Sequence, residues 1–263
     1  MIFSLTYFQI IVLAVLFFLT SVVGVVTGSN SLIAVPAMFQ VGIDPRVAVA
    51  TNMFGLTFMA VGGTLPFLGK GVIDRKRLPA LVSLTLCGSV LGALLVLVVP
   101  SRSLPLIISI AMIAVALFSL WKRDAGVVPP DVAPARKVEV TAYALTFTLG
   151  IYGGFFSGGY VTVLTAVFVA LFGMTFVEAV STTKIVNVFS SLVASIIFMA
   201  RGLVDYKLGI LLAAVMFAGA YVGARVTLKL NNTWLRRIFL ATVIVLALKI
   251  LFYDSLWKGM IKY

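Results

Sequence analysis

A single lysine lies in a polar cluster inside a long apolar stretch of the sequence. The cluster reads S-T-T-K-I-V-N from Ser181 to Asn187, within the apolar block 175–200. An ammonium group at Lys184 is costly in a membrane unless it is paired, hydrated or facing a polar cavity. Asn187 lies on the same helix face, three positions on, and Thr183 would widen the polar stripe. One positive charge among neutral donors is the chemistry of anion binding.

A glycine-rich break precedes this cluster, and a similar break occurs near the start of the chain. The first lies at Gly24 to Ser31 and the second reads G-G-F-F-S-G-G-Y from Gly153 to Tyr160. The apolar runs that follow, 31–42 and 160–172, would cover only about half of a hydrocarbon core about 30 Å thick. Both breaks should therefore lie deep in the membrane. There, backbone N–H groups and the positive ends of half-helices could bind an anion.

The predicted substrate-binding residues come from the two breaks and from the polar clusters that follow them. They are Thr27, Gly28, Ser29, Asn30, Thr51, Asn52, Ser157, Gly158, Gly159, Thr182, Thr183, Lys184 and Asn187. Each hydroxyl could instead only satisfy neighbouring backbone or hold helices together. Lys184 could also extend to the membrane surface if its helix began later than residue 175.

Glu178 is the acidic residue nearest to Lys184 in the sequence. On a helix with 100° per residue the two side chains point about 120° apart, so we do not expect them to pair. Glu178 is therefore the candidate for proton coupling. The alternative is that its carboxylate only complements the positive end of its helix.

Composition places these features in a polytopic membrane protein of the all-α class. Of 263 residues 62% are hydrophobic, and only 20 are Lys or Arg and 8 Asp or Glu, too few for a soluble surface. The net charge is +12, and the Lys and Arg residues that produce it lie mostly between apolar blocks. This placement indicates topology signals in a lipid bilayer rather than a nucleic-acid partner. The blocks are 4–27, 31–42, 46–69, 78–100, 104–121, 140–157, 160–172, 175–200, 208–228 and 235–253.

The residue types exclude several classes of function. The sequence has no histidine and a single cysteine, Cys87, so we expect neither a metal site nor a cofactor. It has few acids inside the apolar blocks, which argues against an enzyme, and no P-loop, which argues against an ATP-driven pump. No Lys or Arg precedes Arg46, so the first block is expected to be a retained helix rather than a signal peptide. The sequence leaves open whether the protein forms a homo-oligomer.

The two halves of the chain repeat each other. At an offset of 131 residues, Gly71-Val72-Ile73-Asp74 matches Gly202-Leu203-Val204-Asp205, and the G-x-x-x-G pair at 88–92 matches that at 219–223. We expect a first membrane repeat at 1–121, a polar proline-rich linker at 122–137 and a second repeat at 138–263. Twelve Lys and Arg residues would lie inside whether the repeats were parallel or inverted. Broken helices at the middle of the membrane are typical of inverted repeats, so the two glycine breaks favour the inverted arrangement.

Several motifs in both halves resemble one known family. They are G-x-x-S-G-G at 154–159, G-x-x-P-x-x-A-V-A-T from Gly42 to Thr51 and A-x-x-T-T-K-x-x-N from Ala179 to Asn187, together with the paired G-[VL]-[IV]-D elements. Together they are similar to the TauE/SafE sulfite exporter family over essentially the whole chain. The resemblance implies a carrier in a bacterial or archaeal inner membrane that moves sulfite or organosulfonates such as sulfoacetate, driven by a proton gradient.

The first half departs from the second where the chemistry matters. It carries Asn52 and Met53 where the second half carries Thr183 and Lys184, so the charge should come from the second half. The sequence thus predicts a secondary transporter of small sulfur-containing oxyanions that works by alternating access. A passive anion channel with the same lining is the alternative, and flux that ignores a proton gradient would distinguish it.

Overall fold

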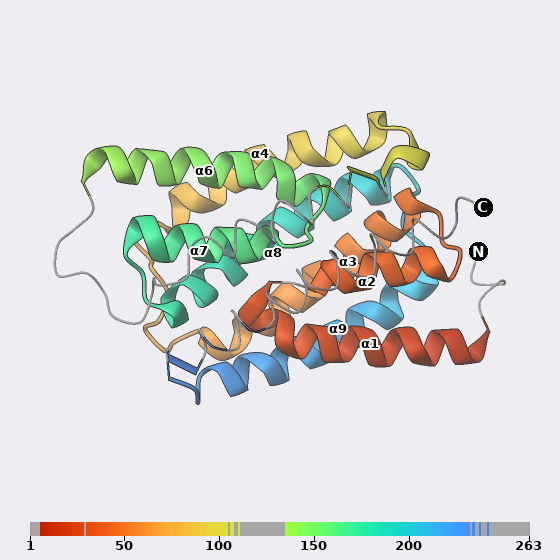
Figure 1. The fold of residues 1–263 in the computed structure, drawn as a ribbon, viewed down its shortest axis with the longest axis horizontal. Coiled ribbons are helices and arrows are strands. Elements are labelled where there is room, and N and C mark those ends of the chain that lie inside the picture. Colours follow the sequence, from red (N-terminus) through yellow and green to blue (C-terminus); the bar gives the residue numbers. More distant parts are fainter. Residues whose placement is uncertain are drawn as a thin grey trace.

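The chain forms a bundle of long and short α-helices in a computed structural model (Figure 1). The structure describes residues 6–28, 30–104 and 135–231, together with 106, 107, 110, 233, 234, 237 and 241. Helices joined by turns and short irregular segments, with no strand among these residues, confirm the all-α class for this part of the chain. The helices are α1 (Tyr7–Thr27), α2 (Asn30–Gln40), α3 (Pro45–Thr64), α4 (Leu78–Val98), α6 (Arg136–Phe155), α7 (Tyr160–Phe172), α8 (Phe176–Ala200) and α9 (Tyr206–Thr227), with the 3-10 turns η2 (Leu65–Phe67) and η3 (Ser101–Ser103).

Some expectations fall largely or wholly outside the described residues. These are the apolar blocks 104–121 and 235–253, and most of the predicted linker 122–137. Helix α6 begins at Arg136, so it starts four residues before the expected block at 140.

Local sequence signals fix where the helices begin and end. Helix α1 starts with a capping box, in which the Thr6 hydroxyl accepts from the Gln9 N–H and the Gln9 side chain accepts from the Thr6 N–H. It ends at Gly28, whose φ of 68° is the left-handed conformation that glycine adopts at low cost. Helix α3 begins with Pro45 after the Asp44 cap. The first glycine break is therefore a true helix end.

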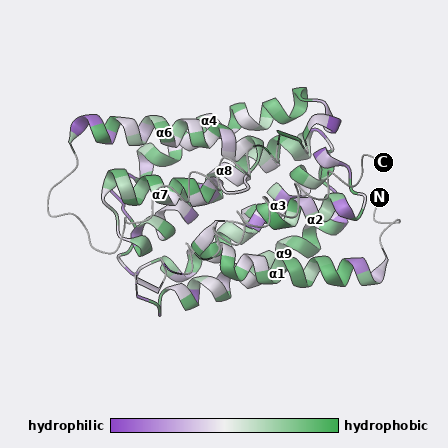
Figure 2. Cartoon of the chain, viewed as in Figure 1, coloured by the Kyte–Doolittle hydropathy of each residue, from purple (hydrophilic) through white to green (hydrophobic). Residues whose placement is uncertain are grey.

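Within the described residues, five helices are long and apolar enough to cross a membrane, namely α1, α3 with η2, α4, α8 and α9. Figure 2 shows hydrophobic residues along the lengths of the helices, with hydrophilic residues at helix ends such as the start of α6. Apolar side chains also lie on the outside of the bundle, for example Ile11 at 62% and Val98 at 79% exposure. Such a surface suits contact with lipid chains rather than water.

The G-x-x-x-G pairs let helices approach closely. A Cβ added to Gly88 would lie 2.6 Å from the Phe147 carbonyl oxygen of α6, and one added to Gly219 would lie 2.6 Å from the Phe18 carbonyl oxygen of α1. These glycines therefore pack backbone against backbone, as small residues do between membrane helices. The contacts join α4 to α6 and α9 to α1, so each half of the chain packs a late helix on the first helix of the other half.

Helices α3 and α8 cross in opposite directions at the centre of the bundle. Thr57 of α3 lies 3.1 Å from Ser195 of α8 between hydroxyl oxygens, whereas Gly63 lies beside Lys184, earlier in α8. In Figure 1, α1 and α3 run from right to left, and α6 and α8 run from left to right. Helices that the 131-residue offset would pair thus have opposite directions, as inverted repeats require. The duplication itself stays a prediction from the sequence.

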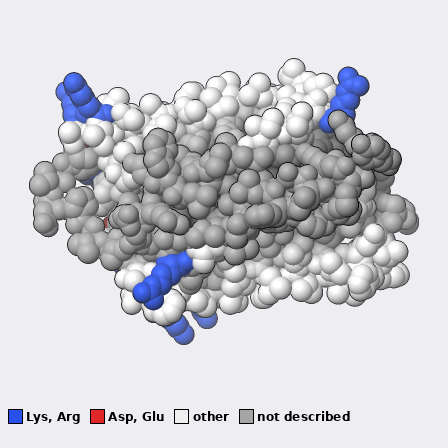
Figure 3. All heavy atoms as spheres, viewed as in Figure 1, with Lys and Arg blue, Asp and Glu red and all other residues white. Residues whose placement is uncertain are grey.

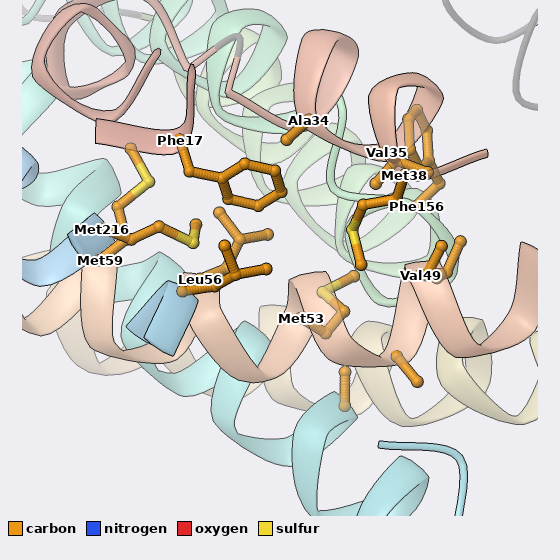
Figure 4. Packing of buried hydrophobic residues seen from close by; sticks show 14 of the residues in the cluster. Phe17, Ala34, Val35, Met38, Val49, Met53, Leu56, Met59, Phe156 and Met216 are labelled. Carbon is orange, nitrogen blue, oxygen red and sulfur yellow. The ribbon is translucent and has the colours of Figure 1, made fainter. Parts of the chain in front are cut away.

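In the described residues, a large apolar core lies mainly between α1, α2, α3 and α9, with further residues from α4 and α8. Figure 4 shows Met53, Met59 and Met216 with Phe17 among the buried side chains of this cluster. Met53 is 1% exposed and belongs to the same buried cluster as Met38 of α2. The position that matches Lys184 in the first half is thus filled by apolar packing.

Candidate functional site

The two glycine breaks lie against each other's helices inside the protein. A Cβ added to Gly28, at the end of α1, would lie 2.5 Å from the Thr162 amide nitrogen in the first turn of α7. The Thr162 hydroxyl donates a hydrogen bond to the Thr27 carbonyl oxygen. From the second break, a Cβ added to Gly158 would lie 2.9 Å from a methyl carbon of Leu32 in α2. The structure therefore brings the first break onto α7 and the second onto α2.

Lys184 lies inside the bundle beside the first break. It is the ninth residue of α8, and its side chain is 2% exposed. Its ammonium Nζ donates to the Gly24 carbonyl oxygen at 3.0 Å, in the last turn of α1. That turn is the negative end of the α1 dipole, which favours a cation. The lysine is therefore held in the interior rather than extending to a surface.

The positive charge of Lys184 has no carboxylate partner in the described part of the chain. The ion pairs found there join Arg77 to Asp74 and to Glu139. A carbonyl oxygen satisfies one of the three N–H donors of an ammonium group. Two donors are therefore left for other ligands.

Asn30 and Asn52 link the first break to its neighbours. The Asn30 Nδ2 group donates to the Thr20 and Ser21 hydroxyls, both at 3.0 Å, and the Asn52 Nδ2 group donates to the Ser31 hydroxyl at 2.8 Å. Both Oδ1 atoms are buried without a partner among the described residues. Because the Ser31 hydroxyl can also donate, rotating the Asn52 amide would free its NH₂ group for a ligand.

The hydroxyls of Thr51 and Thr182 form hydrogen bonds to loops. The Thr182 hydroxyl accepts from the Asp74 N–H at 3.2 Å, and the Thr51 hydroxyl accepts from the Asp205 N–H at 3.0 Å. The two hydrogen bonds join residues that match at the same offset of 131. They tie the paired G-[VL]-[IV]-D loops to the starts of α8 and α3. We call them the two loop clamps, and a role of these threonines in substrate binding stays a prediction.

Replacing Thr182 with valine is expected to lower the free energy of unfolding by about 1 kcal/mol, because the shape is kept and the acceptor for the Asp74 N–H is lost. Thr51→Val should have the same effect through Asp205. Thermal unfolding of the purified protein in detergent measures both. Thr141→Val is the matched control, since its exposed hydroxyl bonds only to the Lys137 carbonyl oxygen one turn earlier. Equal melting temperatures for all three variants would contradict the clamps.

The remaining predicted residues lie in or next to α7 and α8. The Thr183 hydroxyl lies 3.3 Å from that of Thr165 in α7 and donates to the Val180 carbonyl oxygen at 2.9 Å. Asn187 is 4% exposed, on the same helix and face as Lys184. Ser157 is buried, and Gly159 caps the start of α7 with a φ of 77°. Ser29 lies outside the described residues.

Glu178 forms the start of α8. Its Oε2 atom accepts from the Thr175 N–H and hydroxyl, both at 2.9 Å, and its own N–H donates to the Thr175 hydroxyl. This capping box matches the alternative in which the carboxylate serves the helix end. Proton coupling through Glu178 stays a prediction.

Sequence reasoning missed several polar groups near the breaks. Thr162 was one of them, although it occupies the position of Ser31 at the same offset and could have been found in that way. Ser89 and Ser190 were others; their hydroxyl oxygens lie 2.6 Å apart between α4 and α8. Tyr160 is fully buried, and its hydroxyl lies near the hydroxyls of Thr85 and Ser190. No local pattern marks these contacts, because each joins distant segments.

The site as a whole combines one ammonium group with neutral donors and two half-helix starts. In the described residues, no three His, Cys, Asp or Glu side chains form a group that could hold a metal ion. N–H and O–H donors at helix starts favour negative charge, and such contacts need no metal. The arrangement can therefore hold a small anion without help from a metal.

Comparison with known proteins identifies the family of the chain. Residues 13–250 match the family model described as sulfite exporter TauE/SafE. Relatives include a probable membrane transporter protein (ORF9) of Sinorhizobium sp, 29% identical over 89% of each chain, and one of Haemophilus influenzae, 25% identical over 93% of this chain and 96% of the relative. The probable membrane transporter protein YfcA of Escherichia coli K12 is 28% identical over 93% of this chain and 91% of the relative. No solved structure matches the chain. Its apolar spans, the matching model and these relatives together show that the chain is a multi-pass cell-membrane protein and belongs to the TauE/SafE sulfite exporter family of membrane transporters.

Proposed function

We propose that this protein is a secondary carrier that moves a small sulfur-containing oxyanion, such as sulfite or sulfoacetate, by alternating access. The observation that carries the proposal is the buried Lys184 ammonium beside the end of α1, with two N–H donors left over. Buried charge in a membrane protein marks substrate pathways more often than structure. The family to which the chain belongs supports sulfite and related anions as substrates.

The two short helices supply the rest of the proposed site. Helices α2 and α7 begin at Asn30 and Tyr160, next to the breaks, so the positive ends of both dipoles lie inside the bundle. Neutral donors such as Asn187 and Asn52 would complete the binding of the oxyanion, and the neutral donors of the first half would set its orientation.

Alternating access would follow from two inverted halves that rock against each other. The opposite directions of α3 and α8 support this proposal, and so do the two loop clamps that join the halves. Each clamp ties a loop of one half to a helix of the other, at opposite ends of the bundle. Opening one side would then require only one clamp to change.

Uptake of labelled sulfite and sulfoacetate into proteoliposomes tests the proposal. We expect uptake that saturates with substrate, that an imposed proton gradient accelerates, and that empty liposomes lack. Taurine and simple carboxylates in excess measure selectivity. Absence of uptake for every sulfur oxyanion, in protein that is shown to be folded, would overturn the proposed function.

The same assay distinguishes a carrier from a passive anion channel. A channel would give flux that follows the membrane voltage, does not saturate in the same range and ignores the proton gradient. With the membrane voltage held at zero, excess unlabelled anion inside would drive exchange that transiently accumulates labelled anion through a carrier, whereas a channel would only equilibrate the label. Exchange is therefore the outcome that we expect.

A further inference from the structure

A basic hollow lies where α3 and α9 end. It has a volume of about 780 Å³, and its lining includes Lys70, Arg225 and Lys229 but no acidic residue. All three cations are exposed at this end of the bundle. The Arg225 guanidinium carbon lies 4.5 Å from the centre of the Tyr221 ring, a cation–π contact that holds it over the hollow. Three positive charges around one concave surface are a feature that the buried site does not explain.

The hollow lies about one helical turn from the Lys184 side chain. A Cβ added to Gly63 of α3 would lie 3.6 Å from the Lys184 Cδ atom and 3.7 Å from the Ala220 Cβ atom of α9. Two residues after Gly63 comes Leu65, and directly after Ala220 comes Tyr221; both of these line the hollow. The hollow is open, whereas Lys184 is buried, so the two are neighbouring but separate places.

We infer that this hollow is a second oxyanion-binding site, the mouth that collects the anion passed to Lys184. The inference rests on the proposed transport function. Concave surfaces lined by charge of one sign raise the local concentration of the opposite ion and its association rate by about 10-fold to 1,000-fold. The ligand is an anion with several charged oxygens, since guanidinium and ammonium groups bind such oxygens well.

The distribution of charge places this mouth on the cytoplasmic side. Among described residues up to 231, eight Lys and Arg lie at the end of the bundle where α3 finishes and four at the opposite end. Figure 3 shows Lys and Arg side chains at the lower left of the molecule, the end reached by α9. Lys and Arg are enriched on the cytoplasmic side of membrane proteins. The eight are Lys70, Arg75, Lys76, Arg77, Arg136, Lys137, Arg225 and Lys229.

A triple variant tests the mouth. Lys70→Gln, Arg225→Gln and Lys229→Gln together should lower transport of sulfite from this side about tenfold at subsaturating substrate and low ionic strength. The maximal rate should change less than twofold, and the defect should shrink in about 0.3 M salt, where charges are screened. The matched control is Arg75→Gln, Lys76→Gln and Arg136→Gln, which removes equal charge from exposed residues at the same end of the bundle. Equal defects in both triple variants would overturn the inference.

A binding measurement separates this inference from the proposed transport function. Part of the thermal stabilisation of purified protein by sulfite or inorganic phosphate at low salt should persist in Lys184→Met. That remaining part should disappear when Lys70→Gln, Arg225→Gln and Lys229→Gln are added to Lys184→Met. This result does not depend on whether any anion is transported.

The source of the anion is distinguished in the same measurement. A phosphate headgroup offers the same oxygens as a free anion. If phosphatidylglycerol stabilises the wild-type protein more than phosphatidylcholine does, and free sulfite and phosphate have no effect, the hollow holds a lipid. A collecting role would then be wrong.

Discussion

Sulfite uptake is expected to fall about 30-fold or more when Lys184 is replaced by methionine, which corresponds to losing about 2 kcal/mol or more of anion binding. Methionine is the residue at the matching position 53, where it packs in an apolar core. Its unbranched chain is similar in length to that of lysine and fills the same space without a charge. The variant therefore removes the charge and keeps the packing.

The stability of this variant separates a binding role from a structural one. A buried ammonium costs free energy, so removing it should leave the melting temperature unchanged or raise it. Lys76→Met is the matched control, because Lys76 is exposed in the loop before α4 and should keep full transport. A Lys184→Met protein that transports at the wild-type rate would show that the lysine does not bind the substrate.

The second large effect is expected at Gly92, where alanine should prevent α4 from packing on α6. The added Cβ would overlap the Ile151 carbonyl oxygen and lie 2.6 Å from the Phe155 amide nitrogen. Both are backbone atoms of a helix, so neither can turn away as a side chain would. We expect a loss of about 3 kcal/mol, at the upper end for overpacking, and little folded protein after purification.

Gly63→Ala is the matched control for this substitution. It is also a helix glycine, but its nearest neighbours would lie at 3.6 Å, an ordinary contact distance. Alanine there should keep or raise the melting temperature, because alanine favours a helix more than glycine does. Yield from size-exclusion chromatography and thermal unfolding in detergent compare the two variants. Similar stability for Gly92→Ala and Gly63→Ala would mean that α4 and α6 are less tightly packed than described.

Much of the fold follows from local features of the sequence. Apolar length predicts the helices, since a membrane segment has no other way to satisfy its backbone. Glycine and proline predict where they stop, and Gly28 does end α1. The short runs after the breaks are helices α2 and α7, and the G-x-x-x-G pairs are close helix contacts, as their spacing indicates. Family membership also follows from motifs within single segments.

Charge alone could not predict the direction of the repeats, because the counts of basic residues were equal for both orientations, and only the broken helices favoured inverted repeats. Contacts between α3 and α8 show that these two helices run in opposite directions, and the contacts depend on which helix faces fit together. The roles of single hydroxyl groups could not be predicted from the sequence either. Thr51 and Thr182 sit in polar clusters that suggest ligand binding, yet their hydroxyls accept from loop amides more than 100 residues away.

Lys184 shows the same division most clearly. Its type and its place in an apolar run determined that a buried charge needs a partner, because an isolated ammonium is unstable in a membrane. Only the tertiary structure supplied that partner, the Gly24 carbonyl oxygen at the end of α1, 160 residues earlier in the chain. The sequence shows that a buried charged side chain requires a partner. How the helices pack determines which distant backbone atom becomes that partner.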